Sequence, residues 1–162
     1  MSQLVYRGGP VVTLDGKGRI TVPARWRDDL IERVNGHLVV VKCDALCLSL
    51  YPLTEWERYE AELMALPDEH EDWRRILIGS ATDVEIDTGS RVLIPPELRV
   101  WAGLEKDVKF MGVGRHFELW DQQRYDAKER RAIELGKPAA LLRRSPGAPQ
   151  PAAEPVARQV SE

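Results

Sequence analysis

The sequence lacks a long apolar run. Its 162 residues are 43% hydrophobic, yet no stretch approaches the ~18 consecutive apolar residues that a membrane-spanning helix requires. Near the N-terminus, Arg7-Gly8-Gly9-Pro10 interrupts the apolar residues, unlike a secretory signal region. We therefore expect a cytoplasmic protein with no membrane partner, built as one compact domain or two small ones.

Residues typical of metal sites and active sites are also scarce. The two cysteines, Cys43 and Cys47, have a C-x3-C spacing with no matching Cys/His pair, which is a poor zinc pattern. On a strand this spacing places both thiols on one face, and we interpret them as buried, reduced thiols. Gly112-Val-Gly114 lacks the third glycine of a phosphate-binding fingerprint. No nucleophile or ligand spacing surrounds the three histidines, His37, His70 and His116. We expect no enzyme activity, cofactor, metal or small-molecule substrate.

A net positive charge is absent as well. The formal net charge is −3 and the pI about 5.7, which taken alone disfavours nucleic-acid binding. The charge is unevenly distributed, however. Residues 15–27 contain four basic residues and one acid, whereas the segment 87–99 is neutral and residues 68–72 contain four acids. The segment 15–27 is therefore the better candidate for contact with a polyanion.

What the sequence does contain is an internal repeat. Residues 12–27 recur 72 positions later as residues 84–99, with five of sixteen aligned positions identical (Val, Asp, Arg, Pro and Arg). A repeat of this length indicates a duplicated structural unit, and two such units usually pack against each other. Each copy offers one acid and one arginine at a fixed spacing.

The alternation of apolar residues over 11–22 predicts a half-buried hairpin of two short strands around a Gly-rich turn. Pro23 then opens a helix, since its missing N–H has no helical partner at that position. Its apolar face is formed by Trp26, Leu30 and Val34, and Asn35-Gly36 ends it. Residues 38–50 predict two strands with a turn near Asp44.

Two helices are expected between the copies. Thr54-Glu55-Trp56-Glu57 has the form of a capping box, opening a helix to about residue 66. Asp68 with Glu71 repeats that pattern for a second helix, which Gly79 ends. The second helix should bury one apolar face, consisting of Trp73, Ile76 and Leu77.

The second half repeats the order of the first. We expect a hairpin over 84–94, a helix over 95–102 capped by Gly103, two strands within 108–120 turning at 112–115, and a helix over 121–136. From Pro138 onward the chain has five prolines in 25 residues and few large apolar side chains. Such a segment buries too little surface to offset its ordering entropy, so we predict disorder.

The repeated turn is the group of residues whose chemistry suggests a function. Gly16 and Gly18 allow a tight turn and close approach of a partner, and Asp15 can bond to the turn amides. Lys17 and Arg19 would then project from a rigid hairpin, where an arginine fork can grip a phosphate or a guanine edge. The simpler alternative is a solvated hairpin tip with a structural Asp–Arg pair. The second copy, together with Arg25 and Arg27, favours a binding function.

Several separate motifs resemble the MraZ family of transcriptional regulators, in the same order and at the same spacing. In the first half these are Arg7-Gly8, Leu14-Asp-Gly-Lys-Gly-Arg19, Pro23 and Tyr51-Pro-Leu-x-Glu-Trp56. In the second half they are Leu93-Ile-Pro-Pro-x-Leu-Arg99, Ala102-Gly-Leu-Glu-Lys106 and Phe117-Glu-Leu-Trp120-Asp121. The resemblance covers roughly residues 6–135.

This resemblance implies an α+β, mainly β, fold in which two AbrB-like swapped-hairpin units form one β-barrel-like body with flanking helices. Composition predicts a disordered Pro/Ala-rich tail over 137–162. For the rest of the chain, the resemblance implies unit 1 over 9–55, a helical connector over 56–80, unit 2 over 81–124 and a C-terminal helix over 125–136. It also implies a ring-shaped homo-oligomer associated with the nucleoid, which binds direct repeats of double-stranded DNA in the promoter of the bacterial division and cell-wall gene cluster.

The family's DNA contacts come from its D-x-x-x-R turns. Carried over to this sequence they are Lys17, Arg19 and Arg91, to which the composition adds Arg25 and Arg27. The residues expected to shape the loops are Asp15, Gly16, Gly18, Asp87 and Gly89. The second turn departs from the family pattern, because its glycine stands one place early and no lysine is present.

An alternative of another class is an antitoxin-like protein-interaction module. AbrB-like hairpins also occur in antitoxins that bind a toxin through a flexible C-terminal tail, and residues 138–162 resemble such a docking segment. Antitoxins of this kind normally carry one hairpin unit per chain, whereas this chain has two. This counts against the alternative.

Overall fold

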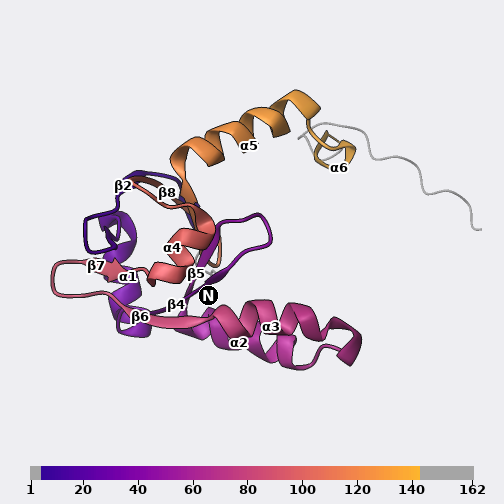
Figure 1. Cartoon of the computed structure of the whole chain (residues 1–162). Coiled ribbons are helices and arrows are strands. Elements are labelled where there is room, and N and C mark those ends of the chain that lie inside the picture. The colour runs from indigo at the N-terminus through magenta and orange to yellow at the C-terminus, as the bar shows by residue number, and fades with distance from the viewer. Residues whose placement is uncertain (1–4, 143–162) are drawn as a thin grey trace, which may run out of the picture. The chain divides into compact units, whose positions relative to one another are not determined.

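The computed structural model describes residues 5–142, in two compact units that divide at Asp126 (Figure 1). In the first half of the chain the elements are β1 (Tyr6–Gly8), β2 (Val11–Thr13), β3 (Arg19–Thr21), α1 (Ala24–Val34), β4 (His37–Lys42), β5 (Leu48–Pro52) and α2 (Leu53–Met64). The 3-10 turn η1 (Asp68–His70) and α3 (Glu71–Ser80) follow. The second half has β6 (Thr82–Glu85), β7 (Arg91–Leu93), α4 (Pro96–Ala102), β8 (Asp107–Gly114) and β9 (Phe117–Asp121). Helix α5 (Gln122–Leu135) crosses the division, and α6 (Ala139–Leu142) belongs to the second unit.

The strands of the two halves pair with each other. One sheet of seven strands has the order β1-β8-β9-β5-β4-β6, with β2 also pairing β8, and a second sheet consists of β3 and β7. All pairs are antiparallel. Thus the first strand of each copy, β2 or β6, pairs with a strand of the other half, and the second strands, β3 and β7, pair together. The fold is mixed α+β, as expected. Among the described strands no pairing closes either sheet into a barrel.

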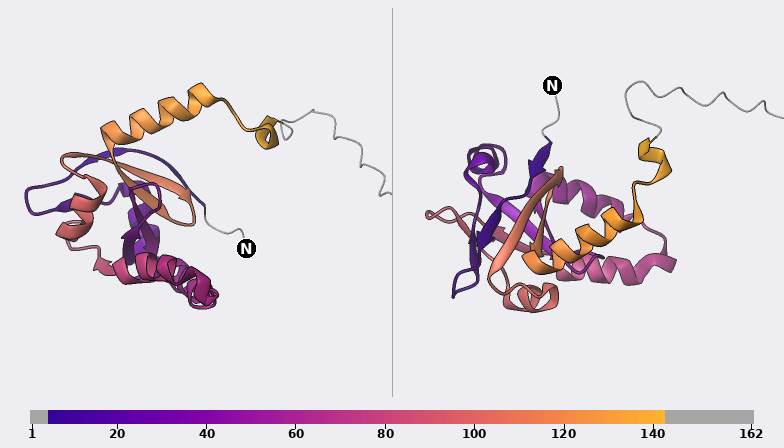
Figure 2. Two further views of the ribbon diagram at one scale, coloured as in Figure 1. Left: turned by 45° about the vertical axis from the view of Figure 1, so that its right-hand side comes forward. Right: turned by 90° about the horizontal axis from the view of Figure 1, so that it is seen from above.

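Each face of the large sheet has its own apolar core. On one face, α1 and α4 pack with β3 and β7 over a cluster that includes Trp26, Ile20 and Val92. On the other face, α2 packs through Trp56 and Leu63 against β4. Helices α2 and α3 contact each other and run antiparallel, as the right-hand view of Figure 2 shows. The two-stranded β3–β7 sheet is therefore held against the core on one of its faces only.

Several local expectations are confirmed. Pro23 precedes α1, whose buried residues are Trp26, Leu30 and Val34. Asn35 ends this helix in the left-handed conformation, with φ of 53°, and Gly103 ends α4 in the same way. A single described helix, α5, extends over most of the range expected for the last one. None of the described helices is long and apolar enough to cross a membrane.

The predicted hairpins are wrong in their pairing. Strands β2 and β3 flank the first turn, but their ladders are made with β8 and β7. Across the turn itself the backbone hydrogen bonds run from Asp15 N to Arg19 O at 2.9 Å and from Gly18 N to Asp15 O at 3.0 Å. The alternation of apolar residues predicted two half-buried strands correctly. It could not identify their partners, which lie about 70–100 residues away in the sequence.

The predicted caps of the connecting helices are also wrong. Pro52 stands at the N-cap of α2, so this helix begins before Thr54 and has no side-chain cap. Helix α3 likewise has no side-chain cap, and it continues through Gly79 to Ser80.

The apolar face of α3 is oriented differently from the prediction. Trp73 and Ile76 remain 46% and 41% exposed. Leu77 packs against the α2 cluster as predicted, and the other α3 side chain that does so is Ile78, which the predicted face did not include. Of the predicted disordered tail, residues 139–142 form α6, and residues 143–162 lie outside the described part of the chain.

Candidate nucleic-acid interface

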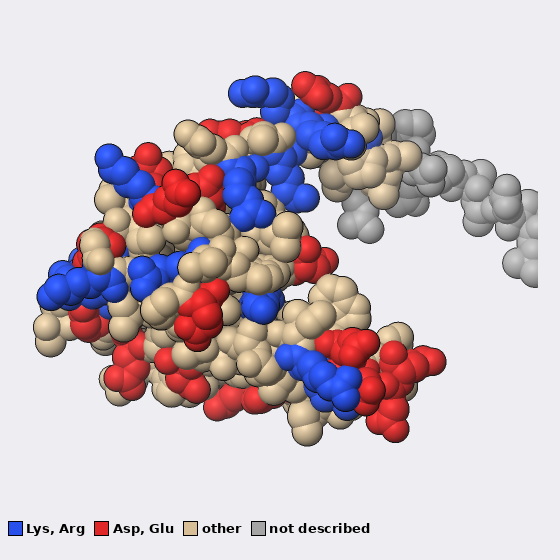
Figure 3. All heavy atoms as spheres, in the orientation of Figure 1, with Lys and Arg blue, Asp and Glu red and all other residues tan. Residues whose placement is uncertain are grey.

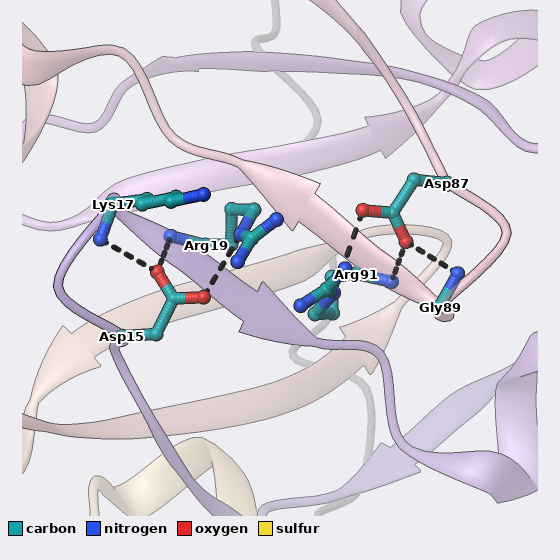
Figure 4. Close-up of polar contacts among 6 residues, drawn as sticks. All are labelled: Asp15, Lys17, Arg19, Asp87, Gly89 and Arg91. Atoms are coloured by element: carbon teal, nitrogen blue, oxygen red, sulfur yellow. Dashed lines mark hydrogen bonds and ion pairs between the residues drawn. The ribbon is translucent and has the colours of Figure 1, made fainter.

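The first turn is organised around the carboxylate of Asp15 (Figure 4). Its Oδ1 accepts hydrogen bonds from the backbone N–H groups of Lys17 and Arg19, both at 2.9 Å. Its Oδ2 accepts a third bond from Nε of Arg19, also at 2.9 Å. Gly18 adopts a φ of +84° and donates its N–H to the Asp15 carbonyl at 3.0 Å. One carboxylate therefore fixes both the backbone of the turn and the direction of the arginine.

The second turn repeats this geometry in spite of its altered sequence. Oδ1 of Asp87 accepts the N–H groups of Gly89 at 2.8 Å and Arg91 at 2.9 Å, and Oδ2 lies 3.5 Å from Nε of Arg91. Ser90 takes the place of Gly18, with a φ of +63°. A serine thus adopts the left-handed conformation that glycine adopts in the first copy, and Gly89 itself does not have a positive φ.

The β3–β7 sheet brings the two arginines onto one face. Its register pairs Arg19 with Leu93, Ile20 with Val92, and Thr21 with Arg91. Because alternate residues of a strand point to opposite faces, the buried central pair Ile20–Val92 leaves the flanking residues on the outer face. Both arginines lie there, next to Leu93, which is 52% exposed. The result is a small, rigid basic surface with pseudo-two-fold symmetry.

Each turn is also tied to the other half of the chain. The N–H of Val22 donates to the carbonyl of Ser90, and the N–H of Ile94 donates to the carbonyl of Gly18, both at 2.9 Å. These two bonds are related by the same offset of 72 as the sequence repeat. The left-handed residue of each turn is therefore anchored by the strand of the other copy, so neither turn is an independent loop.

The Asp–Arg pairs leave the binding edge of each arginine available. Asp15 and Asp87 form ion pairs with Nε of Arg19 and Arg91, and within residues 5–142 no ion pair involves the Nη atoms of either arginine. The paired Nη atoms are the fork that matches a phosphate or the O6/N7 edge of guanine. Lys17 is exposed beside the first pair. The surface can thus present two oriented forks and one exposed ammonium group to an anionic partner.

The aspartates remain ionised well below neutral pH. Hydrogen bonding from the backbone N–H of Arg19 is the largest cause that lowers the pKa of Asp15 from 3.8 to about 2. The backbone N–H of Arg91 has the same effect on Asp87, whose pKa is also lowered. Both carboxylates are therefore charged acceptors throughout the physiological pH range.

The two other predicted basic residues differ in environment. Arg25 is exposed, with its guanidinium against Gly8 and 5.4 Å from the centre of the Trp26 ring. Arg27 is half-buried and its Nη2 donates to the Val22 carbonyl at 2.9 Å. Arg27 therefore supports the strand segment that anchors the second turn, while Arg25 lies at the surface.

One further residue, Arg99, supports the first turn and was not predicted from the sequence. Its guanidinium packs directly against Gly18, where a Cβ atom would collide with it. Gly16, the other glycine of the turn, has open space around it. The signal was present in the repeat, because Arg99 aligns with Arg27 as one of the five identities.

Basic and acidic side chains are interspersed over much of the face in Figure 3, but one acidic cluster stands out. Acidic side chains gather at the far tip of the α2–α3 pair, where η1 and the start of α3 contain Asp68, Glu69, Glu71 and Asp72. The basic turns belong to a different part of the same unit. The negative net charge therefore does not exclude an anionic partner at the turns.

Away from the turns, one cluster of the described residues has metal-ligating chemistry. It consists of Cys43, Cys47 and Glu118, whose ligand atoms all lie within 4.8 Å of one another. The cysteines are free thiols; Cys47 is buried and Cys43 half-buried.

The whole sequence was compared with known protein families and with known proteins. The family described as "MraZ protein, putative antitoxin-like" matches residues 5–79 and again residues 77–144. A protein of Burkholderia cenocepacia named "Transcriptional regulator MraZ" is 48% identical over 137 residues, which cover 85% of this chain and 96% of that protein. Proteins of the same name from Burkholderia vietnamiensis and Burkholderia mallei are 48% and 47% identical with the same coverage.

Proposed function

The chain belongs to the MraZ family, and on this premise we propose that it is a sequence-specific DNA-binding regulator of transcription. Similar proteins bear the name of transcriptional regulator. The observation that carries the proposal is the outer face of β3–β7, where two turns of the same geometry hold Arg19 and Arg91 with their forks unengaged.

In this proposal the two arginines read base edges or phosphates, and Lys17 adds a phosphate contact. Each bidentate arginine–guanine pair contributes about 1–3 kcal/mol of discrimination. Asp15 and Asp87 do not touch DNA. They fix the forks before binding, which reduces the side-chain entropy that the complex would otherwise lose. Gly18 and Ser90 set the turn backbone, and Gly16 and Gly89 complete the loops.

One such face is a weak site, so we propose that the chain acts as a ring-shaped homo-oligomer on tandem promoter repeats. Linking identical sites makes later contacts intramolecular and can raise avidity by about 10²–10⁴-fold. The exchange of strands between halves, β2 with β8 and β6 with β4, supports two swapped-hairpin units in each chain. The target is the promoter of the division and cell-wall gene cluster, which would associate the protein with the nucleoid.

A titration with DNA from upstream of its own gene tests the proposal. We expect tight binding that survives excess unrelated DNA and weakens steeply with salt, since each neutralised phosphate releases condensed counterion. Equal affinity for the upstream DNA and for a scrambled duplex of the same composition would reject sequence-specific regulation.

The family's description as antitoxin-like favours testing a second function, that of a protein-interaction module. Removing residues 143–162 should leave DNA affinity within about twofold, because both turns lie far from this segment in the sequence. Stoichiometric capture of one protein partner by the full chain, lost upon this deletion, would favour the antitoxin-like module instead.

A further inference from the structure

The second apolar face of the large sheet contains a cavity that the DNA-binding proposal does not use. It has a volume of about 610 Å³ and lies between β4, β5 and β9 on one side and α2 and α3 on the other. Its wall includes Cys43, Glu118 and His116. The rest of the wall combines apolar and aromatic side chains with the polar residues Lys42, Asp44, Ser49, Glu62 and His70.

The sheet register brings Cys47, which does not itself line the cavity, close to Cys43 and Glu118. Cys43 N donates to Cys47 O at 3.0 Å across the turn between β4 and β5. Strand β9 then pairs with β5 so that Glu118 stands opposite Ser49, which lies on the same face as Cys47. Glu118 Oε2 lies 3.8 Å from Cys43 Sγ.

The carboxylate of Glu118 is oriented by a second residue. Trp120 Nε1 donates to its Oε1 at 3.1 Å, which leaves Oε2 directed toward the thiol of Cys43. An outer hydrogen bond of this kind is the usual device for orienting a metal-ligating carboxylate. Glu118 is also only half-buried, so its charge is accommodated without a buried cationic partner.

We propose that Cys43, Cys47 and Glu118 form a binding site for one thiophilic divalent cation of the Zn²⁺ class. With Zn–S of about 2.3 Å and Zn–O of about 2.0–2.2 Å, tetrahedral ligand atoms are separated by roughly 3.5–3.8 Å. The Cys43–Glu118 distance already has this value, and all three atoms lie within 4.8 Å. Two thiolates select Zn²⁺ over Mg²⁺ or Ca²⁺. Three protein ligands leave a fourth position, which water or a small ligand in the cavity would occupy.

This site is independent of the turns, since none of its three residues belongs to the DNA-binding surface. The spacing C-x3-C alone predicted buried thiols, and it could not include a carboxylate that follows Cys43 by 75 residues. The sheet pairing supplies that third ligand.

Cobalt binding tests the proposal on the full-length, metal-stripped and chemically reduced protein. We expect a thiolate-to-cobalt charge-transfer band that saturates at one Co²⁺ per chain and disappears when Zn²⁺ is added. The substitutions Cys43→Ser and Glu118→Gln should each weaken Co²⁺ binding by more than tenfold, and Cys47→Ser should do the same.

Glu62→Gln is the matched control, because Glu62 lines the same cavity but lies outside the cluster. Its affinity for Co²⁺ should stay within twofold of the wild type. The proposal is overturned if the reduced wild type gives no charge-transfer band, if the band persists unchanged in Cys43→Ser, or if Glu62→Gln weakens binding as much as Glu118→Gln. Because Cys47 is fully buried, Cys43→Ser and Glu118→Gln decide the outcome should Cys47→Ser fail to fold.

Discussion

The carbonyl oxygen of Gly18 accepts a 2.9 Å hydrogen bond from the backbone N–H of Ile94, a residue of the opposite half of the chain. Its counterpart joins Ser90 to Val22 at the same distance. Through these two bonds the arginine turns and the β3–β7 ladder form one structural element. Changes to the backbone of one turn should therefore affect the stability of the whole first unit.

Alanine substitutions at Gly18 and Gly16 test whether the turn backbone affects the stability of the first unit. Gly18→Ala places a Cβ at a φ of +84° and against the Arg99 guanidinium, so we expect a loss of about 1–2 kcal/mol in the free energy of unfolding. Gly16→Ala meets open space and should change it by less than about 0.5 kcal/mol. Urea denaturation measures both. Equal losses in the two variants would show that the contact with Arg99 and the left-handed backbone have no special role.

Comparing Arg27 with Arg25 distinguishes a structural role of an arginine from the simple loss of one surface charge. Arg27→Ala removes the hydrogen bond to the Val22 carbonyl and should lower the free energy of unfolding by about 1–3 kcal/mol. Arg25→Ala removes the same charge from an exposed position and should cost less than about 0.5 kcal/mol. Thermal unfolding of both variants, each checked for oligomeric state, is the measurement. An unfolding temperature of Arg27→Ala that matches that of Arg25→Ala would contradict the supporting role.

The pH dependence of stability should show whether the ionised carboxylate of Asp15 stabilises the folded protein. Its pKa is lowered in the folded protein, so its contribution is fully present above the unfolded value of 3.8 and is lost as the pH falls toward about 2. Compared with Asp15→Asn, the wild type should therefore have its largest advantage in urea midpoint at neutral pH, and this advantage should disappear between pH 4 and 2. A gap that stays constant over this range would mean that ionisation of Asp15 does not hold the turn.

Much of this architecture could be predicted from the chain. The repeat predicted two equivalent turns, and Asp15 and Asp87 bond to their turn amides as expected. Local signals at Pro23, Asn35 and Gly103 gave helix boundaries correctly, because each acts through its own backbone conformation.

What could not be predicted depends on contacts between distant segments. The partners of β2 and β3, the exposed position of Trp73 and the approach of Glu118 to Cys43 are all set by tertiary pairing. Serine in the left-handed position of the second turn was also hidden, since the sequence favours Gly89 for that role. Ser90 is held there by its bonds to Asp87 and Val22.

If the outer face of β3–β7 binds DNA through its two arginine forks, as proposed, then Arg19→Ala should lose affinity for the upstream DNA, and a binding titration of this variant is the decisive experiment. Loss of a bidentate contact worth about 1–3 kcal/mol corresponds to roughly 5–150-fold per site, and repetition of the site in an oligomer should enlarge this to complete loss of promoter binding. Light scattering and thermal unfolding on the same preparation should match the wild type. A correctly assembled Arg19→Ala protein that binds the upstream DNA with unchanged affinity would rule out DNA binding through this face.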